Sequence, residues 1–448
     1  MAEVDVAVVG AGFAGLTVAR ALRDAGRSVC VLEARDRVGG RTDTTTVGGT
    51  TVDLGGQWVG PGQDRLYALA DELGVETVAQ FEEGDLVLLR GAGPEQLADM
   101  VDAFSDDAIG AYLTAIGELE ALAENVDVEE PWASPAAEEL DSITMASWMR
   151  DHMPDAGGRD LLELGIEAVF ATEPANLSVL HLAFYCASSG GWARLTDTDG
   201  GAQQDRFVGG VRPLAEALAA QLGDDVVLGA PVRRIDHGDD GVTIHHDAGS
   251  LRARRAAVAL PPTLAGRLDY RPALPAWRDQ LTQRLPGGSV IKFHVVYESP
   301  WWRAEGLSGQ VFVVGGRIDV TFDCSPPDSS NGVITGFFEG VQAIAAADLG
   351  EEGRRDHVVG VLADALGQRA HDWVDYVDRD WSEEEFTRGC YGAHMPPGAW
   401  TQLGYGLRRP VGALHWAGTE TARQWMGYIE GAIESGERAA AEIDAALG

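Results

Sequence analysis

Three glycines and one acid near the N-terminus have the types and spacing of a dinucleotide site. Gly10, Gly12 and Gly15 lie between the apolar run VDVAVV and a segment of helical periodicity, which predicts a strand, a tight turn and a helix. Gly10 permits the turn, Gly12 lets a pyrophosphate approach the backbone, and Gly15 lets the helix pack closely on the strand. A second predicted strand, SVCVLEA, places Glu33 where a ribose 2′-hydroxyl would lie. We therefore expect a dinucleotide site rather than an ordinary strand-to-helix turn.

The segments that follow carry further cations and glycines. VLEARDRVGGRT suits a second set of phosphate contacts, and VDLGGQWVGP supplies another glycine pair for close backbone approach. At this point the chain resembles the flavin-containing amine oxidases, and monoamine oxidase most closely. The likeness covers nearly the whole chain, in the ordered segments PWASPAAEELDSITM, FVGG, ALPPTL, GGSVIK, GCY, PPG, AGTETA and WMGYIEGA. It implies an α/β fold in which a Rossmann-like FAD-binding domain is interleaved with an α+β substrate domain, as in monoamine oxidase and glutathione reductase.

FAD is therefore the expected cofactor, and no metal site is expected. Cys390 falls where monoamine oxidases join the flavin through an 8α-thioether, although a nearby cysteine can also remain a free thiol. The helical run that begins after Tyr428 can turn its N-terminal amides toward the electron-rich edge of a reduced flavin. The expected FAD contacts are Gly10, Gly12, Gly15, Glu33, Ala34, Arg35, Gly40, Arg41, Gly56, Gln57, Trp58, Val232, Cys390, Gly418, Thr419, Glu420, Gly427 and Ile429.

Four residues are expected to take part in the reaction. By resemblance, Tyr391 and Tyr428 are the two walls of an aromatic cage that strips water from an amine and aims its α-carbon at the flavin. Desolvation favours the neutral amine, whereas cation–π attraction favours the ammonium. Lys292, the only lysine in the chain, matches the family lysine that is hydrogen-bonded through a water to flavin N5. Trp381 matches a family tryptophan packed near the same water, with a plain core aromatic as the alternative.

The elements that would position these residues fall into two interrupting domains. We expect an FAD-binding domain made of residues 1–80, 205–285 and 385–448, and a substrate domain made of residues 81–204 and 286–384. The first domain contains the predicted strands PVRRIDH, GVTIHH and RARRAAVAL. The second contains helical periods such as DAIGAYLTAIGELEALAENV and the strands SVIKFHVVYE and QVFVVGG.

Composition narrows the partners and the compartment. The 448 residues carry a net charge of −36, which argues against nucleic acid and anionic membranes as partners. The acidic, lysine-poor composition fits either a salt-loving organism or a GC-rich genome. No apolar run reaches the roughly 18 residues of a membrane helix, and no secretory signal precedes the first strand, so a cytoplasmic protein is expected. Four scattered cysteines imply no disulfide framework.

The substrate is the least determined feature of the sequence. The expected reaction converts an amine, O2 and water to an aldehyde, ammonia and hydrogen peroxide. No carboxylate can be singled out to hold a distal ammonium, so aryl-alkyl or alkyl monoamines rank ahead of putrescine and polyamines. An L-amino-acid oxidase, which would need Arg423 or Arg194 at the flavin, ranks third, and a non-enzymatic FAD-binding scaffold ranks last. The resemblance allows a homodimer. The expected pocket residues are Val169, Phe170, Leu195 and either Gln203 or Gln204.

Overall fold

The computed structural model describes residues 2–91, 93–327 and 329–448, and its largest element is an eight-stranded sheet. Strands β1, β2, β10, β13 and β20 pair in parallel, whereas β11, β12 and β13 pair antiparallel. The sheet order is β10 (Val226–Val227), β2 (Val29–Leu32), β1 (Ala2–Val9), β13 (Gly249–Val258), β12 (Gly241–His246), β11 (Val232–Gly238) and β14 (Asp269–Arg271), with β20 (Leu414–Trp416) beside β13.

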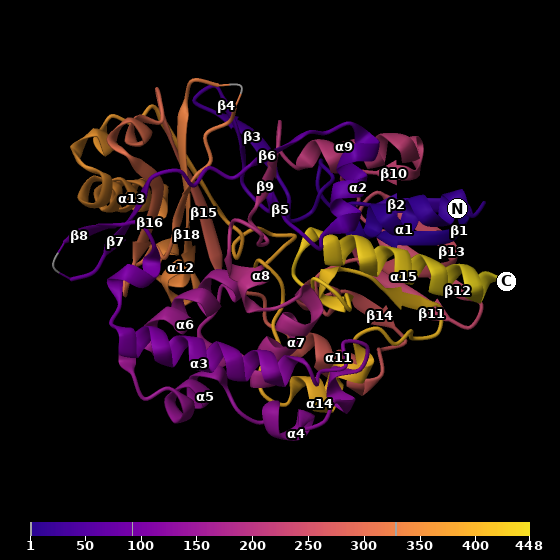
Figure 1. Cartoon of the computed structure of the whole chain (residues 1–448). Coiled ribbons are helices and arrows are strands. Elements are labelled where there is room, and N and C mark those ends of the chain that lie inside the picture. The colour runs from indigo at the N-terminus through magenta and orange to yellow at the C-terminus, as the bar shows by residue number, and fades with distance from the viewer. Residues whose placement is uncertain (1, 92, 328) are drawn as a thin grey trace.

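The parallel part of this sheet is covered by helices, as its continuous apolar strands require. Val6 to Val9 of β1 are almost fully buried, because a strand in the middle of such a sheet has no face in water. Helices α1 (Phe13–Asp24) and α15 (Ile429–Leu447) lie side by side, although they come from opposite ends of the chain (Figure 1). Nearby lie α2 (Asp64–Leu73) and α9 (Arg212–Leu222).

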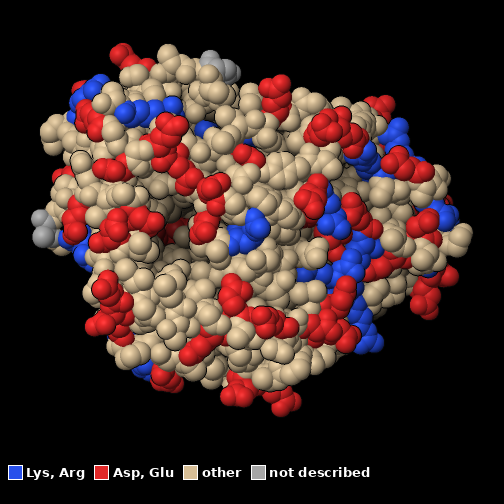
Figure 2. Space-filling model, viewed as in Figure 1, with Lys and Arg blue, Asp and Glu red and all other residues tan. Residues whose placement is uncertain are grey.

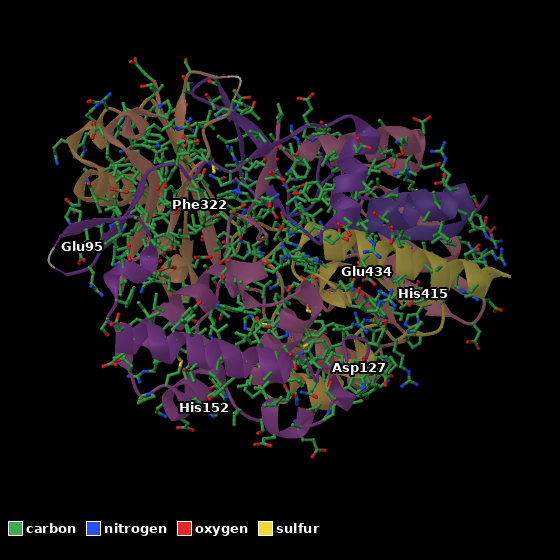
Figure 3. The ribbon with its side chains drawn as sticks, viewed as in Figure 1. Glu95, Asp127, His152, Phe322, His415 and Glu434 are labelled. Carbon is green, nitrogen blue, oxygen red and sulfur yellow. The ribbon has the colours of Figure 1, made fainter. Side chains whose placement is uncertain are left out.

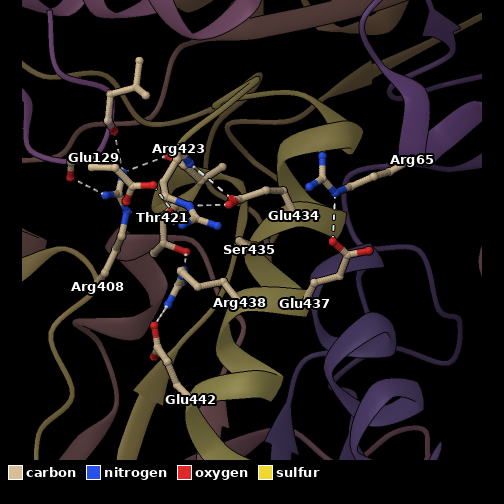
Figure 4. Close-up of polar contacts among 12 residues, drawn as sticks. Arg65, Glu129, Arg408, Thr421, Arg423, Glu434, Ser435, Glu437, Arg438 and Glu442 are labelled. Atoms are coloured by element: carbon tan, nitrogen blue, oxygen red, sulfur yellow. Dashed lines mark hydrogen bonds and ion pairs between the residues drawn. The ribbon is translucent and has the colours of Figure 1, made fainter.

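Ion pairs connect α15 with the loop that precedes it and with α2 (Figure 4). Arg423, in the loop, donates to Glu434 of α15 at 2.6 Å, and Glu434 is almost fully buried. Arg65 of α2 forms an ion pair with Glu437 at 2.8 Å. The start of α15 is therefore fixed relative to the loop that carries Tyr428.

A second region of the molecule is built on a four-stranded antiparallel sheet. Its order is β17 (Thr321–Asp323), β18 (Gly332–Glu339), β15 (Val290–Tyr297) and β19 (Asp375–Asp380). Strand β16 (Leu307–Val313) pairs with β7 (Asp85–Leu89), which pairs with β8 (Pro94–Leu97). Helices α12 (Gly340–Ala347) and α13 (Gly350–Leu366) adjoin this region. Phe322 of β17 lies well inside the outline of the molecule, whereas Glu95 and His152 lie near its edge (Figure 3).

A layer of helices completes the second region below these sheets (Figure 1). Several of these helices begin at a side-chain cap: Ser105 accepts from the amide of Ala108, and Ser178 accepts from that of His181. The layer contains α3 (Asp106–Ala123), α4 (Ala137–Leu140), α5 (Met145–His152), α6 (Ala156–Phe170), α7 (Val179–Ser189), α8 (Trp192–Thr196), α11 (Ala276–Gln283) and α14 (Ala399–Leu403). The remaining elements are α10 (Pro262–Ala265) and the short strands β3 (Thr44–Val47), β4 (Thr50–Asp53), β5 (Trp58–Val59), β6 (Thr77–Ala79) and β9 (Asp205–Phe207).

The predicted fold class is confirmed, because a parallel sheet with covering helices adjoins a mixed α and β region. The strands of the large sheet lie in residues 2–32, 226–271 and 414–416, inside the three segments assigned to the FAD-binding domain. The division into two domains itself stays a prediction. Among the described residues, no helix combines the length and the apolar character needed to cross a membrane.

Candidate active site

One long cavity of about 1080 Å³ connects the glycine-rich turn with the C-terminal tyrosines. Residues far apart in the sequence share its wall, so the fold brings most of the predicted site together. The predicted residues on the wall are Gly10, Gly12, Glu33, Ala34, Arg35, Gly40, Arg41, Gly56, Gln57, Trp58, Val169, Phe170, Leu195, Gln203, Val232, Cys390, Tyr391, Gly418, Thr419, Gly427, Tyr428 and Ile429. Gly15, Gln204, Lys292, Trp381 and Glu420 lie outside this lining.

The nucleotide end of the cavity has the geometry that a dinucleotide requires. Gly10 has φ +99°, and a Cβ on Gly15 would lie 1.9 Å from the Gly10 carbonyl oxygen, so only glycine fits there. Glu33 accepts hydrogen bonds from the amides of Ala11 at 2.7 Å and Arg35 at 3.0 Å, which fix its carboxylate at the wall. No described side chain caps the N-terminus of α1, so its donors and dipole are available to a pyrophosphate. These residues fit the phosphates and ribose of FAD.

A buried ion pair joins the nucleotide end to the tyrosine segment. Arg41 donates to Glu420 at 2.6 and 3.1 Å, and it also donates to the carbonyl oxygen of Tyr391 at 2.9 Å. Burial opposes the charge on Arg41, yet the adjacent Glu420 carboxylate raises the pKa of its guanidinium above the ordinary value. Glu420 also accepts from the amide of Ala393 at 3.3 Å. The pair therefore positions the backbone of the loop that carries Tyr391.

The two predicted cage tyrosines come from separate loops that touch each other. A Cβ on Gly392 would lie 3.1 Å from the Cα of Gly427, so the residues next to the tyrosines are packed together. Tyr391 makes an edge contact with Phe337, with ring centroids 6.0 Å apart. Tyr428 makes an edge contact with Trp425, with ring centroids 5.0 Å apart, and its carbonyl oxygen accepts from the Thr419 hydroxyl at 2.8 Å. Both phenols lie on the cavity wall, and burial raises the pKa of each.

Cys390 lies on the cavity wall as a free, buried thiol. Burial raises its pKa to about 12, although Arg41 acts in the opposite direction. The thiolate is the nucleophilic form of cysteine, and burial favours the protonated thiol over it. Its bond to a flavin stays a prediction.

Lys292 and Trp381 lie directly behind the wall. The Lys292 ammonium donates to the Gly55 carbonyl oxygen at 2.7 Å and to the Gln57 side-chain oxygen at 2.5 Å, and both acceptors belong to cavity-lining residues. Burial lowers the pKa of Lys292 to about 8, although Asp53 acts in the opposite direction. Trp381 is buried and donates through its indole to the Leu54 carbonyl oxygen at 2.8 Å.

The two neighbouring glutamines named for the pocket lie in different places. Gln203 lines the cavity and donates to the Leu195 carbonyl oxygen at 3.3 Å. Gln204 lies outside the lining, where it contacts Asp205 at 3.2 Å and accepts from the amide of Gly200 at 3.2 Å, so the structure favours Gln203. The chain turns between the two residues, and sequence spacing cannot show which one points inward.

Neither arginine named for an amino-acid carboxylate reaches the cavity wall. Arg194 donates to the Gly200 carbonyl oxygen, and Arg423 is bound to Glu434 and Glu129.

Several wall residues are not evident from the sequence. One of them is a carboxyl group, because Glu339 ends strand β18 on the cavity wall and is 2% exposed. A charged residue at the end of the apolar run GVITGFFE is the signal that could have found it. Figure 2 shows a hollow in one face of the molecule with acidic side chains at its edge. The other missed wall residues include Glu82, Asp99, Tyr185, Asp197, Val320, Phe322 and Phe337.

Comparison with known proteins identifies the family of this chain and leaves its substrate open. A family model described as flavin containing amine oxidoreductase matches residues 13–444. The chain belongs to this family. This amine oxidoreductase is 41% identical to AofH of Mycobacterium tuberculosis, by name a monoamine oxidase, over 99% of this chain and 97% of that protein. It is 38% identical to the putrescine oxidase of Kocuria rosea, over 98% of this chain and 95% of that protein.

A solved structure agrees with these sequence matches. Wild-type putrescine oxidase bound to putrescine superposes with a TM-score of 0.95 at 36% identity, and 99% of each chain is covered. The present protein is therefore an enzyme of flavin-dependent amine oxidation. The relatives named for monoamines and for putrescine are similarly identical to it, so they do not distinguish its substrate.

Proposed function

We propose that this enzyme oxidises a primary amine held between Tyr391 and Tyr428 to an aldehyde, with release of ammonia and hydrogen peroxide. One observation carries the proposal: both phenols lie on the same cavity wall as the glycine-rich turn and Glu33. A cofactor bound along Gly10, Gly12 and Glu33 would extend toward the two tyrosines. The reacting end of a substrate would then meet the flavin ring at the tyrosines.

The chain's own residues prepare the amine for oxidation. The tyrosine rings, Phe337 and Phe170 replace water around the substrate, and the loss of water favours the neutral amine. The bound flavin would accept two electrons from the amine, and O2 would then take them up as hydrogen peroxide. Water hydrolyses the resulting imine to the aldehyde and ammonia. Atoms and electrons balance for one amine, one O2 and one water.

Different residues along the cavity would hold the different parts of FAD. The N-terminus of α1 and Glu33 would hold the pyrophosphate and ribose, and Val232 would lie beside the adenine end. The wall beside the flavin ring would be formed by Gly56, Gln57, Gly427 and Ile429. All of these assignments are parts of the proposal.

The test is anaerobic reduction of the purified yellow enzyme, followed by a peroxide assay in air. Phenethylamine, putrescine and L-phenylalanine separate the monoamine, diamine and amino-acid alternatives. We expect the amines to bleach the flavin and L-phenylalanine to leave it oxidised, because Arg194 and Arg423 do not line the cavity. A flavin that no amine bleaches would leave only the scaffold alternative.

A covalent bond between Cys390 and the flavin forms a separate part of the proposal. The thiol lies on the cavity wall together with Tyr391, as a thioether requires. Acid precipitation of the holoenzyme should therefore leave the yellow colour in the pellet, and the Cys390→Ala variant should release it into the supernatant. Colour in the wild-type supernatant would contradict the bond and leave the amine oxidation intact.

A further inference from the structure

The arginines on the cavity wall differ in whether an acid of the protein neutralises them. Three of them, Arg35, Arg41 and Arg233, form ion pairs with acidic side chains. Two others, Arg267 and Arg388, also line the cavity and are exposed. Neither of these two forms an ion pair with any acid in residues 2–91, 93–327 and 329–448. The wall therefore contains two positive charges that the described protein does not neutralise.

Unpaired arginines are unexpected in so acidic a chain. The sequence contains 70 acidic residues against 34 basic ones, so an arginine seldom lacks an acid nearby. The same excess of negative charge repels an anionic ligand as it approaches. Because salt screens charges beyond about 10 Å at 0.1 M, positive groups close to the ligand have to provide the attraction. An anionic group bound in the cavity is the natural partner of the two side chains.

The backbone of Arg388 has a conformation that suits glycine better than arginine. Its φ is +59°, a region that residues other than glycine seldom adopt. Its amide donates to the Glu384 carbonyl oxygen at 3.1 Å, and its neighbours Thr387 and Gly389 are buried. A Cβ on Gly389 would lie 2.8 Å from the Gly288 carbonyl oxygen. The backbone is therefore fixed, and a contact of the side chain has to explain why arginine occupies this position.

The segment that carries Arg388 lies beside the predicted ribose end of the cavity. Arg35 donates to the Thr387 hydroxyl at 2.6 Å and to the Glu384 carboxylate at 3.2 Å. The amide of Arg35 donates in turn to Glu33, the acid expected at the ribose. These bonds connect residues 384–388 with the nucleotide end, so Arg388 is placed on the wall near the phosphates.

Arg267 reaches the same end of the cavity from another segment, the one that contains α10. A Cβ on Gly10 would lie 2.9 Å from the Ala259 carbonyl oxygen and 3.0 Å from a methyl group of Leu260. Both of these residues line the cavity, as does Arg267 shortly after α10. The α10 segment thus lies directly against the glycine-rich turn, where the diphosphate of a dinucleotide is expected.

We propose that Arg267 and Arg388 neutralise the diphosphate of bound FAD. The inference rests on FAD lying in this cavity, as in the proposed function. The N-terminus of α1 supplies only about half an elementary charge, which is less than a doubly anionic diphosphate requires. Glu385 also lines this end of the cavity, but it acts on Arg233, whose pKa is raised first by Asp247 and further by Glu385.

The test measures how tightly the enzyme holds FAD, independently of catalysis. The parent protein is the Cys390→Ala holoenzyme, from which flavin can dissociate, and the fluorescence of released FAD over a dilution series gives Kd. Arg388→Gln and Arg267→Gln should each raise Kd by about tenfold or more, because each removes a charge-assisted contact. An unchanged Kd in either variant would overturn the proposal.

Arg252→Gln is the matched control. Arg252 is exposed, lies outside the cavity lining and forms no ion pair with a described acid. It is located on β13 near the end that is remote from Ala259. Its loss changes the net charge of the protein by the same amount, so Kd should stay within about twofold of the parent value. An effect as large as that of Arg388→Gln would assign the change to net charge and overturn the proposal.

Two further substitutions separate a contact with FAD from a structural role in the loop. Glycine fits the positive φ at residue 388, so Arg388→Gly should be tolerated by a loop that only needs its backbone conformation. We expect this variant to lose FAD as readily as Arg388→Gln does. Arg388→Lys keeps the charge and should recover most of the affinity. A glycine variant with the affinity of the parent would contradict the proposal.

Salt dependence provides a readout that a structural role would not change. A plot of log Kd against log salt concentration should rise less steeply in Arg388→Gln and Arg267→Gln than in the parent, because each variant lacks an attractive charge that salt can screen. Arg252→Gln should keep the slope of the parent. Equal slopes in all of these proteins would overturn the proposal. The proposed function fails separately, in the case where the enzyme binds FAD and no amine bleaches it.

Discussion

Among single residues, Lys292 is the one expected to affect the reaction with O2 most. Lys292 is the only lysine among 448 residues, and its ammonium is held by two wall residues, Gly55 and Gln57. Such a compact, buried charge can stabilise the negative charge that develops on oxygen during reoxidation. Arginine has a planar, extended head and cannot take the same place.

Lys292→Met should therefore slow reoxidation of the reduced enzyme by O2 by about tenfold or more, with a smaller effect on reduction by amine. Separate stopped-flow measurements of the two half-reactions provide the check. Equal slowing of both half-reactions would count against this role.

The pH dependence follows from the same residue. Burial lowers the pKa of Lys292 to about 8, so the ammonium is present below that pH and is lost as the pH rises through it. Reoxidation should accordingly slow above about pH 8 in the wild-type enzyme. The step should be missing in Lys292→Met, and a step of the same size in that variant would assign it to another group.

The site residues named from the sequence lie in short, recognisable motifs. The wall residues that were missed become apparent only from contacts between segments that are far apart in the chain. The two tyrosines lie in the short motifs GCY and GYIEG, and both line the cavity, while their role as a cage stays a prediction. Glu339 becomes significant only because Tyr391, 52 positions away, donates to it. Gln203 and Gln204 could not be separated because the direction of each side chain depends on a local turn.

At the element scale, the contact between α1 and the turn before it controls the nucleotide end of the cavity. A Cβ on Gly15 would lie 1.9 Å from the Gly10 carbonyl oxygen, which is backbone and cannot rotate away. The strand and helix on either side were predictable from apolar periodicity. The closeness of their packing was predictable from the glycine spacing.

Gly15→Ala should lower the free energy of unfolding by about 2 to 3 kcal/mol and reduce the bound flavin. Urea unfolding and the ratio of flavin to protein absorbance measure the two effects. Gly117→Ala is the control, because Gly117 is exposed in α3 with no atom within 4 Å of a Cβ, and it should stabilise by about 0.5 to 1 kcal/mol. A Gly15→Ala protein as stable and as yellow as the wild type would refute the steric argument.

At the scale of the whole molecule, the net charge of −36 lowers the stability of the folded state and favours the capture of a cationic substrate. Like charges repel in the compact state, and acidic residues also lie on the cavity wall at Glu82, Asp99 and Asp197. Salt screens both effects beyond a distance of about 10 Å at 0.1 M.

Raising the salt concentration from 10 mM to 1 M should therefore increase the melting temperature while it lowers kcat/KM for putrescine by roughly three- to tenfold. The decrease should be smaller for n-butylamine, which carries one positive charge instead of two. Thermal unfolding and steady-state kinetics over a salt series measure both trends. A kcat/KM that does not depend on salt would exclude electrostatic attraction of the substrate.

The order of strands in the large sheet has a consequence for biosynthesis. Strand β20 and helix α15 are synthesised long after β1 and α1, yet β20 pairs with β13 and α15 packs on α1. The N-terminal βα unit therefore lacks one of its covering helices until α15 and the loop carrying Tyr428 have been made. Chaperones that shield exposed apolar surface would meet this unit during translation, and uptake of the coenzyme would follow the synthesis of α15.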